Sequence, residues 1–85
     1  MGFALWIDSD TEIAWAEGTH EYRPLGAAAI ARKGQFRHAD FTRNLKRPPR
    51  LENSFAGFYG SLEEVNATLR GQTAWKLRWT PGHLR

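Results

Sequence analysis

The stretch GFALWIDSDTEIAWAE, residues 2–17, decides the fold class of this chain. Apolar side chains alternate with small or polar ones on both sides of an acidic turn, a period of two that is typical of a β-hairpin. We expect a three-residue loop, because a two-residue loop would divide the large apolar side chains between the two faces. That register places five of them on one face: Phe3, Leu5, Ile7, Ile13 and Trp15. Trp6 then lies on the opposite face, among alanines.

An amphipathic helix is predicted over residues 61–70. The sequence SLEE, which starts at Ser61, is a capping box: the Ser61 hydroxyl accepts from the Glu64 amide, and the Glu64 carboxylate accepts from the Ser61 amide. Apolar side chains follow at helical spacing, and a glycine marks the end of the helix. These residues are Leu62, Val65, Leu69 and Gly71.

Residues 24–41 admit two interpretations, and 24–33 is either helix or strand. As a helix, the stretch would begin near a proline, run through alanines and end at a glycine. As a hairpin, 27–32 and 35–41 would be strands joined by a Lys-Gly turn. The helix would have Arg23 as a poor N-cap and a glycine in its first turn, so the hairpin is favoured.

The rest of the chain completes an α+β domain. A proline pair makes 42–50 a loop, 51–59 forms a short strand or an aromatic-rich turn, and 73–79 forms a final strand. We therefore expect a single domain, residues 1–85, in which a mainly antiparallel sheet of about five strands packs against one helix.

The composition excludes several classes of protein. The chain has 85 residues and no cysteine, which excludes a disulfide framework, a thiolate nucleophile and a cysteine zinc site. Its apolar runs, such as 27–31, are far shorter than the roughly 18 residues of a membrane span, and the first residues lack the basic region of a signal peptide. We expect a folded cytoplasmic protein with no membrane partner and no cofactor.

The net charge of +3 is the sum of three unequal segments. Residues 1–22 carry five acids and no Lys or Arg (−5), residues 23–50 eight bases and one acid (+7), and residues 51–85 four bases and three acids (+1). A segment with such an excess of cations attracts polyanions. Alternatively, the acidic and basic segments pair with each other and leave no basic face.

The leading hypothesis is a small basic nucleic-acid-binding or accessory protein, in which residues 32–50 neutralise phosphates of DNA or RNA. The proline pair would hold the neighbouring cations in an extended loop that loses little entropy on binding. A basic hairpin over 27–41 would be able to enter a major groove, and exposed aromatic rings would stack on unpaired bases. The candidate phosphate contacts are Arg32, Lys33, Arg37, Arg43, Lys46, Arg47 and Arg50.

The alternative hypothesis is a protein-interaction module. It would be a homodimer, or an inhibitor or accessory subunit that docks on an acidic protein surface. Four Trp and five Phe are a surplus for the core of so small a domain. Trp15, Trp75 and Trp79 are predicted core residues, because they fall on apolar stripes. The candidates for an interaction surface are Trp6, Phe36 and Tyr59.

The sequence contains no recognisable catalytic motif, and we predict that the chain is not an enzyme. A small nuclease is the third hypothesis, with His38 as general base beside Asp40 on one face of a strand. The acidic turn has the ligand spacing that opens a calcium loop. However, Ile13 stands where such a loop needs glycine, so no metal site is predicted.

Overall fold

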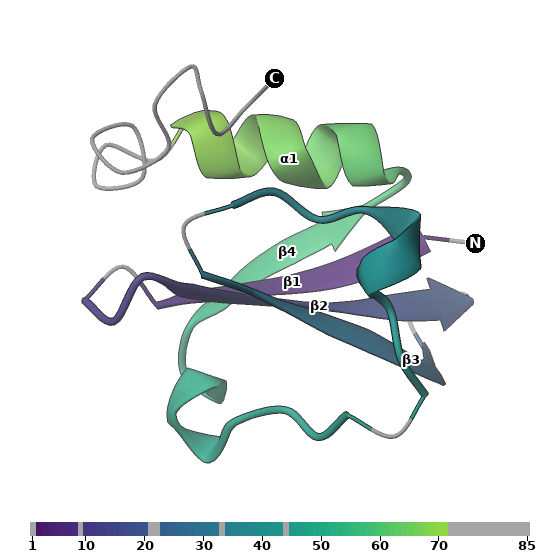
Figure 1. Ribbon diagram of the computed structural model, residues 1–85, viewed down its shortest axis with the longest axis horizontal. Helices are drawn as coiled ribbons and strands as arrows, with labels where there is room; N and C mark the ends of the chain where they lie inside the picture. Colours follow the sequence, from purple (N-terminus) through teal and green to yellow (C-terminus); the bar gives the residue numbers. More distant parts are fainter. Residues whose placement is uncertain (1, 9, 21–22, 33, 44, 72–85) are drawn as a thin grey trace.

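Residues 2–8, 10–20, 23–32, 34–43 and 45–71 are described by the computed structural model. They form a four-stranded antiparallel sheet with one α-helix packed against it (Figure 1). In sheet order the strands are β3 (Arg23–Arg32), β2 (Ile13–His20), β1 (Gly2–Asp8) and β4 (Phe55–Tyr59). The helix, α1 (Leu62–Gly71), follows β4. The predicted α+β class is confirmed, with four strands in this part of the chain where about five were expected.

The helix covers one face of the sheet and builds the main core there. Alanines of β2 and β3 line the centre of this face, and rings from the segment after β3 complete it. The rings of Phe3 and Phe41, for example, have their centroids 5.5 Å apart. The buried members of this core are Phe3, Leu5, Ala14, Ala16, Ala29, Ala31, Phe36, Leu62, Val65 and Leu69.

The predicted hairpin of β1 and β2 forms, but its predicted register is wrong. Asp8 pairs with Ile13, so four residues, 9–12, connect the strands instead of three. The Asp8 carboxylate accepts a hydrogen bond from the Asp10 N–H at 3.1 Å, and Glu12 has the left-handed conformation with φ 59°. This local turn chemistry sets the loop length, and the alternation of apolar residues does not report it.

The longer loop divides the apolar side chains of the hairpin between the two faces. Trp6 pairs with Trp15, on the face that α1 does not cover. With Ala4, Ala28 and Leu51 they form a second, smaller hydrophobic cluster. The predicted core position of Trp15 is confirmed, since 1% of it is exposed. Of the two outcomes open for Trp6, packing under another element or exposure to a partner, the structure shows the first, because only 9% of Trp6 is exposed and it clusters with Leu51.

The predicted helix is confirmed, together with its buried apolar stripe. The Ser61 hydroxyl accepts from the Glu64 N–H at 3.2 Å, as the capping box requires. The Glu64 carboxylate accepts from the N–H of Gly60 at 2.7 Å, one residue earlier than predicted. Both hydrogen bonds fix the direction in which the chain leaves β4.

The strand interpretation of 24–33 is confirmed over its described residues, 24–32, but the second predicted hairpin does not form. β3 pairs with β2 along its length. The chain then passes through an irregular segment and a short 3-10 helix, His38–Asp40. It meets β3 again at an isolated bridge between Ala28 and Thr42. Within the described residues, 35–41 therefore gives no second strand and no basic ribbon.

Asn66 of α1 explains why the segment after β3 leaves the sheet. Its side-chain amide donates to the Phe36 carbonyl and accepts from the Phe36 N–H, both at 3.0 Å. These two bonds give the Phe36 backbone the partners that a strand neighbour would have supplied. The Phe36 ring is 2% exposed and lies in the core under α1. The predicted exposure of Phe36 is therefore wrong.

Residues 45–54 cross the sheet face that α1 leaves uncovered (Figure 1). Of these, 45–50 belong to the predicted loop, and the segment includes a short 3-10 helix, Pro49–Leu51. Leu51 is 1% exposed and anchors this segment on the second hydrophobic cluster. The segment rejoins the sheet where the Ile7 N–H donates to the Ser54 carbonyl at 2.8 Å.

A bulge interrupts β4 between its pairings with Leu5 and Trp6, and Ala56 is the extra residue. The next residue, Gly57, has φ 134°, a conformation that favours glycine. Because the extra residue shifts the alternation by one position, both phenylalanines of the strand lie on the face away from α1. These residues are Phe55, opposite Trp6, and Phe58, opposite Ala4.

Two further predictions concern a final strand and a membrane span. The predicted strand over 73–79, with Trp75 and Trp79, lies outside the described residues. Among the residues that are described, no helix has the length and apolar composition of a membrane span.

Candidate functional site

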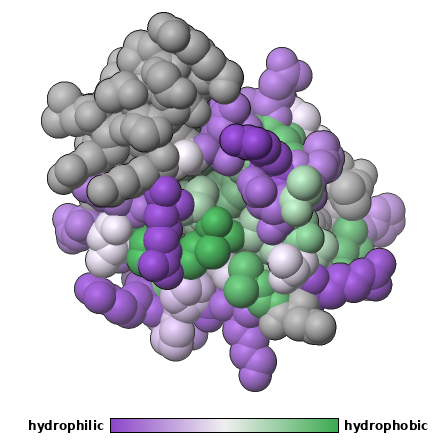
Figure 2. Space-filling view, viewed as in Figure 1, coloured by the Kyte–Doolittle hydropathy of each residue, from purple (hydrophilic) through white to green (hydrophobic). Residues whose placement is uncertain are grey.

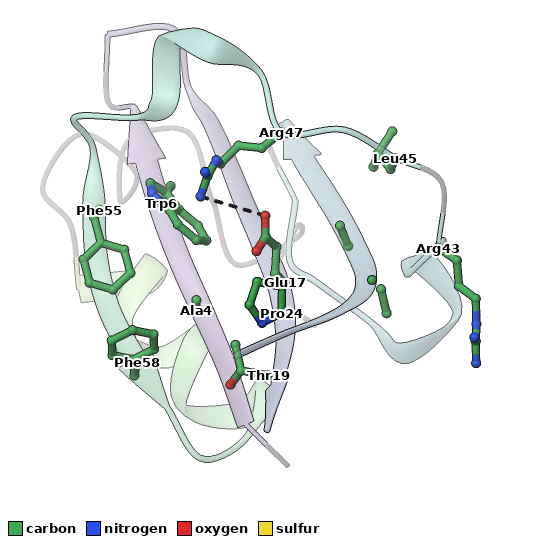
Figure 3. Close-up of a pocket in the computed structure, with 13 residues that line it drawn as sticks. Ala4, Trp6, Glu17, Thr19, Pro24, Arg43, Leu45, Arg47, Phe55 and Phe58 are labelled. Atoms are coloured by element: carbon green, nitrogen blue, oxygen red, sulfur yellow. Dashed lines mark ion pairs between the residues drawn. The ribbon is translucent and has the colours of Figure 1, made fainter. Parts of the chain in front are cut away.

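An open hollow of about 390 Å³ lies on the sheet face that α1 does not cover (Figure 3). Ala4 and Trp6 of β1 belong to its lining. Phe55 and Phe58 line it on the β4 side, and Arg47 reaches over it from the crossing segment. The hollow is thus formed by the second face of the sheet and by the loop that partly covers it.

Three aromatic rings follow one another along the β1–β4 side of the hollow. The ring centroids of Trp6 and Phe55 are 5.2 Å apart and those of Phe55 and Phe58 5.0 Å apart, both in edge-to-face geometry. Phe55 and Phe58 are 46% and 45% exposed. Adjacent exposed rings of this size are typical of a binding surface. Figure 2, which has the same view as Figure 1, shows that hydrophobic residues also reach the surface on that side of the molecule, with hydrophilic residues around them.

Arg47 connects the crossing segment to the acidic hairpin across the hollow. Its guanidinium carbon lies 4.3 Å from the centroid of the Trp6 ring, in cation–π geometry. Its Nη1 lies 3.9 Å from Oε1 of Glu17 (Figure 3). The same Glu17 oxygen accepts a hydrogen bond from the Trp15 indole N–H at 2.9 Å. The buried Trp15 indole therefore fixes the Glu17 carboxylate by a hydrogen bond, whereas Arg47 approaches the same carboxylate only at the longer distance of an ion pair.

The predicted phosphate contacts do not all gather at the hollow. Arg43 and Arg47 line it, and Lys46 is exposed beside Arg47 in the same segment. The Arg43 side chain extends away from the other labelled residues (Figure 3). Arg32 is exposed at the end of β3, and Arg37 is exposed just before the first 3-10 helix. Lys33 lies outside the described residues, and Arg50 is exposed in the second 3-10 helix.

The basic segment partly neutralises the acidic hairpin. Arg47 contacts Glu17. The pKa of the Asp8 carboxyl is lowered first by the Thr11 side chain, then by the N–H groups of Thr11 and Asp10, and last by the positive charge of Arg50 in the basic segment. Pairs at the surface contribute only about 0–1 kcal/mol each, since water and salt screen them. The fold therefore combines the two expected arrangements. Arg47 and Arg50 lie near acids of the hairpin, while Arg43 and Lys46 are exposed at or beside the hollow.

The residues predicted for a protein-interaction surface do not share one face. Trp6 belongs to the cluster under the crossing segment, and Phe36 belongs to the core under α1. Tyr59 is half-buried against the α1 core, and its hydroxyl donates to the Ala56 carbonyl at 3.2 Å. Among the described residues, the exposed phenylalanine rings are instead Phe55 and Phe58.

His38 and Asp40 lie on a 3-10 turn and not on a strand, so the predicted shared strand face is wrong. The Asp40 carboxylate accepts from the Arg37 N–H at 3.0 Å and closes this turn. His38 lines a second, smaller hollow of about 210 Å³, together with Leu25 and Arg43. Among the described residues, no group of three or more His, Asp or Glu side chains is placed to hold a metal ion.

Sequence reasoning missed three residues of the hollow: Glu17, Phe55 and Phe58. Their common face depends on the hairpin register and on the β4 bulge, and neither follows from the apolar pattern. One signal was present in the sequence, because a glycine inside an aromatic strand, here Gly57, indicates a bulge. A bulge there would have placed both phenylalanines on one face.

Comparison of the chain with protein-family models, with curated proteins and with solved structures finds no match. The chemistry of the hollow is therefore the basis for assigning a function. The hollow combines exposed aromatic rings, long cationic side chains and one carboxylate that is held by a hydrogen bond.

Proposed function

We propose that the protein binds single-stranded nucleic acid in the hollow on the open face of its sheet. The observation that carries this proposal is the pair of exposed rings, Phe55 and Phe58, in one hollow with Arg43 and Arg47. Aromatic rings stack on bases while arginine and lysine neutralise phosphates. This combination is typical of proteins that bind single strands with tolerance of sequence.

The position of the rings favours unpaired bases over a duplex. Phe55 and Phe58 lie on a strand of the sheet, within a hollow that the crossing segment borders. A base must leave a duplex before its face can stack on such a ring. Reading a duplex needs a helix or a ribbon in the major groove, and the ribbon predicted over 27–41 does not form in the described part of the chain.

The cations beside the hollow supply the electrostatic part of binding. Arg43, Lys46 and Arg47 are exposed on the segment that follows β3, within a few residues of one another. Three phosphate contacts to a single strand give a salt slope of about −2, because each contributes about −0.7. The affinity then falls roughly 20-fold between about 50 and about 200 mM salt.

Fluorescence anisotropy with a labelled oligouridylate or oligothymidylate tests the stacking. Replacing Phe58 with alanine removes one exposed ring, and we expect a loss of about 1–3 kcal/mol in binding free energy. Leu25→Ala is the matched control, since Leu25 is 44% exposed but does not line this hollow. Equal binding by wild type and Phe58→Ala would contradict stacking at this ring, and a total lack of binding at low salt would end the proposal.

A second pair of variants tests the phosphate contacts. Lys46→Gln should reduce the steepness of the salt slope by about 0.7, because one phosphate contact is lost. Arg37→Gln removes the same charge from an exposed position away from the hollow and should leave the slope nearly unchanged. If both variants change the slope equally, binding depends on net charge and not on this site.

A protein-interaction module is the second candidate, and one observation favours it. Phe55 and Phe58 are exposed on a strand that is at the edge of the described sheet, where a second protein would be able to add a strand. Light scattering after size-exclusion chromatography tests the homodimer. A dimer that Phe58→Glu dissociates supports this candidate, and a monomer at high protein concentration contradicts the homodimer.

A further inference from the structure

Glu17 stands out in the hollow, because it is the one acidic residue among the described residues that line it. A carboxylate repels phosphates, so its presence in a site for a polyanion calls for a separate explanation. Its side chain is 16% exposed, compared with 35% for Arg47. The carboxylate is thus mostly withdrawn from water, yet it borders the space that a base would occupy.

The hydrogen-bonding capacity of Glu17 is only partly used. The Trp15 indole N–H and the Arg47 guanidinium both approach the same oxygen, Oε1, at 2.9 and 3.9 Å. A carboxylate has about four acceptor positions on its two oxygens. The Trp15 bond fixes the direction of the group, and Trp15 itself is buried and cannot easily move. Glu17 therefore presents an oriented set of acceptors to the hollow.

Among the common bases, guanine matches an oriented carboxylate best. Its Watson–Crick edge carries two neighbouring donors, N1–H and the N2 amino group, which can meet both carboxylate oxygens. Adenine and cytosine carry one amino donor beside a ring-nitrogen acceptor, and uracil carries one N–H between two carbonyls. In those bases an acceptor would face the carboxylate and lose its hydrogen bond to water.

We propose that Glu17 makes the hollow selective for guanine, with the base stacked on the Phe55–Phe58 side and its Watson–Crick edge on the carboxylate. This inference rests on the proposed single-strand binding and adds a base preference to it. Phosphates on either side of the guanine would lie toward Arg43, which lines the hollow, and toward Lys46, which is exposed in the crossing segment. The site would thus bind any single strand weakly and a guanine-containing strand more tightly.

The test compares short labelled oligouridylates that carry one central guanosine, inosine, adenosine or cytidine. We expect the guanosine strand to bind at least about fivefold more tightly than the adenosine or cytidine strand, the range that a bidentate contact gives. Inosine keeps N1–H but lacks the N2 amino group, so its strand should bind with intermediate affinity. These comparisons use the wild-type chain and do not depend on the folding of any variant.

Glu17→Gln then assigns the preference to this residue. The glutamine carbonyl can still accept from the Trp15 indole, and an unchanged melting temperature would show that the fold is kept. We expect the guanosine preference to disappear, so that Glu17→Gln binds the guanosine, adenosine and cytidine strands alike. Glu63→Gln, on the exposed side of α1, removes the same charge and should preserve the preference.

The failure of this inference differs from the failure of the proposed function. If wild type binds all four strands equally, or prefers a base other than guanine, the role of Glu17 is wrong and single-strand binding stands. If the guanosine preference persists in Glu17→Gln, another residue reads the base. If no strand binds at low salt, both proposals fall.

Discussion

Asn66 makes the most consequential side-chain hydrogen bonds in the fold. Its amide group pairs with both backbone groups of Phe36, thirty positions earlier in the chain, and so holds the Phe36 ring in the core. A sequence pattern has no way to signal this pairing, because an asparagine on the polar side of a helix usually faces water. The loss of the second predicted hairpin follows from it.

Asn66→Asp should destabilise the fold by about 1–3 kcal/mol, the range for a buried polar group that loses its partner. The aspartate can still accept from the Phe36 N–H, but its second oxygen would face the Phe36 carbonyl at the position of a former donor. Urea unfolding measures the change. Glu63→Gln, an exposed substitution on the same helix, is the control, and equal midpoints for both variants would contradict the role of Asn66.

Asp8 should give the hairpin turn a stability that depends on pH. The Thr11 side chain beside Asp8 is the largest cause that lowers the pKa of the Asp8 carboxyl, although Thr11 Oγ1 forms no hydrogen bond within the usual distance and angle limits. The N–H groups of Thr11 and Asp10 and the charge of Arg50 also lower this pKa. Because the folded pKa lies below the unfolded one, this stability is present above the unfolded pKa and is lost as the pH falls through the folded pKa.

Thermal unfolding across the acid range measures this effect. Wild type should lose stability as the pH falls below about 4, and Asp8→Asn should lose less over the same range, because the asparagine does not titrate. Glu63→Gln, an exposed substitution on α1 and outside the hairpin, serves as the comparison. Parallel curves for wild type and Asp8→Asn would show that another group is responsible.

At the scale of elements, the β4 bulge decides which side chains the hollow receives. Gly57→Ala places a Cβ at φ 134°, where side chains are rarely found, and we expect a loss of about 1–3 kcal/mol of stability. The added Cβ would meet only the Tyr59 ring, at ordinary contact distance, so the cost comes from the backbone. Calorimetric unfolding measures it.

Gly57→Ala also tests whether the bulge positions Phe55 and Phe58 for binding, apart from its effect on the stability of the fold. If the strand relieves the strain by expelling the bulge, Phe55 or Phe58 turns to the other face and single-strand binding weakens. Gly34→Ala is the control, since Gly34 lies outside the strands, has open space for a Cβ and has no positive φ. Unchanged stability and binding in Gly57→Ala would mean that the bulge does not need glycine.

The elements were predictable where the signal was local. The helix followed from its capping box and apolar stripe, and the first hairpin followed from strict alternation. The hairpin register was not predictable from the same pattern, because Glu12 in the left-handed conformation adds a residue to the loop. The division of Trp6 and Trp15 from the main core, and hence the hollow, depends on that one residue.

At the scale of the whole molecule, the sheet has two unequal faces. One is covered by α1, and the other is covered only by the crossing segment, which Leu51 anchors. Leu51→Ala should cost about 2–5 kcal/mol, as is usual for a buried leucine, and this is a large part of the stability of so small a domain. Urea unfolding measures the loss.

Leu45→Ala tests whether the stability lost in Leu51→Ala is specific to Leu51 or would follow from removing any leucine of the crossing segment. Leu45 lies in the same segment but is 38% exposed, so its removal should change stability by less than about 1 kcal/mol. Similar losses for the two variants would contradict the view that Leu51 alone anchors the segment. A wild-type midpoint for Leu51→Ala would show that the second cluster adds little.

The composition of the chain predicted the positive charge of the candidate site but not the arrangement of its side chains. The excess of cations over 23–50 indicated a polyanion, and three of those cations do lie at or beside the hollow. Which of them gather, and beside which rings, depends on how the segment after β3 crosses the sheet. That path is determined by contacts far apart in sequence, such as Leu51 against the pair of tryptophans.

If the hollow binds bases as proposed, the guanidinium over Trp6 affects the size of the ligand that binds there. A base that reaches Trp6 takes the place of the guanidinium, so binding there is an exchange in which about 0.5–2 kcal/mol of cation–π attraction is given up. A free nucleoside bears that loss without compensation. A polynucleotide recovers it, because the displaced Arg47 can turn to a phosphate of the same strand. The protein would thus discriminate against monomers through competition from its own side chain.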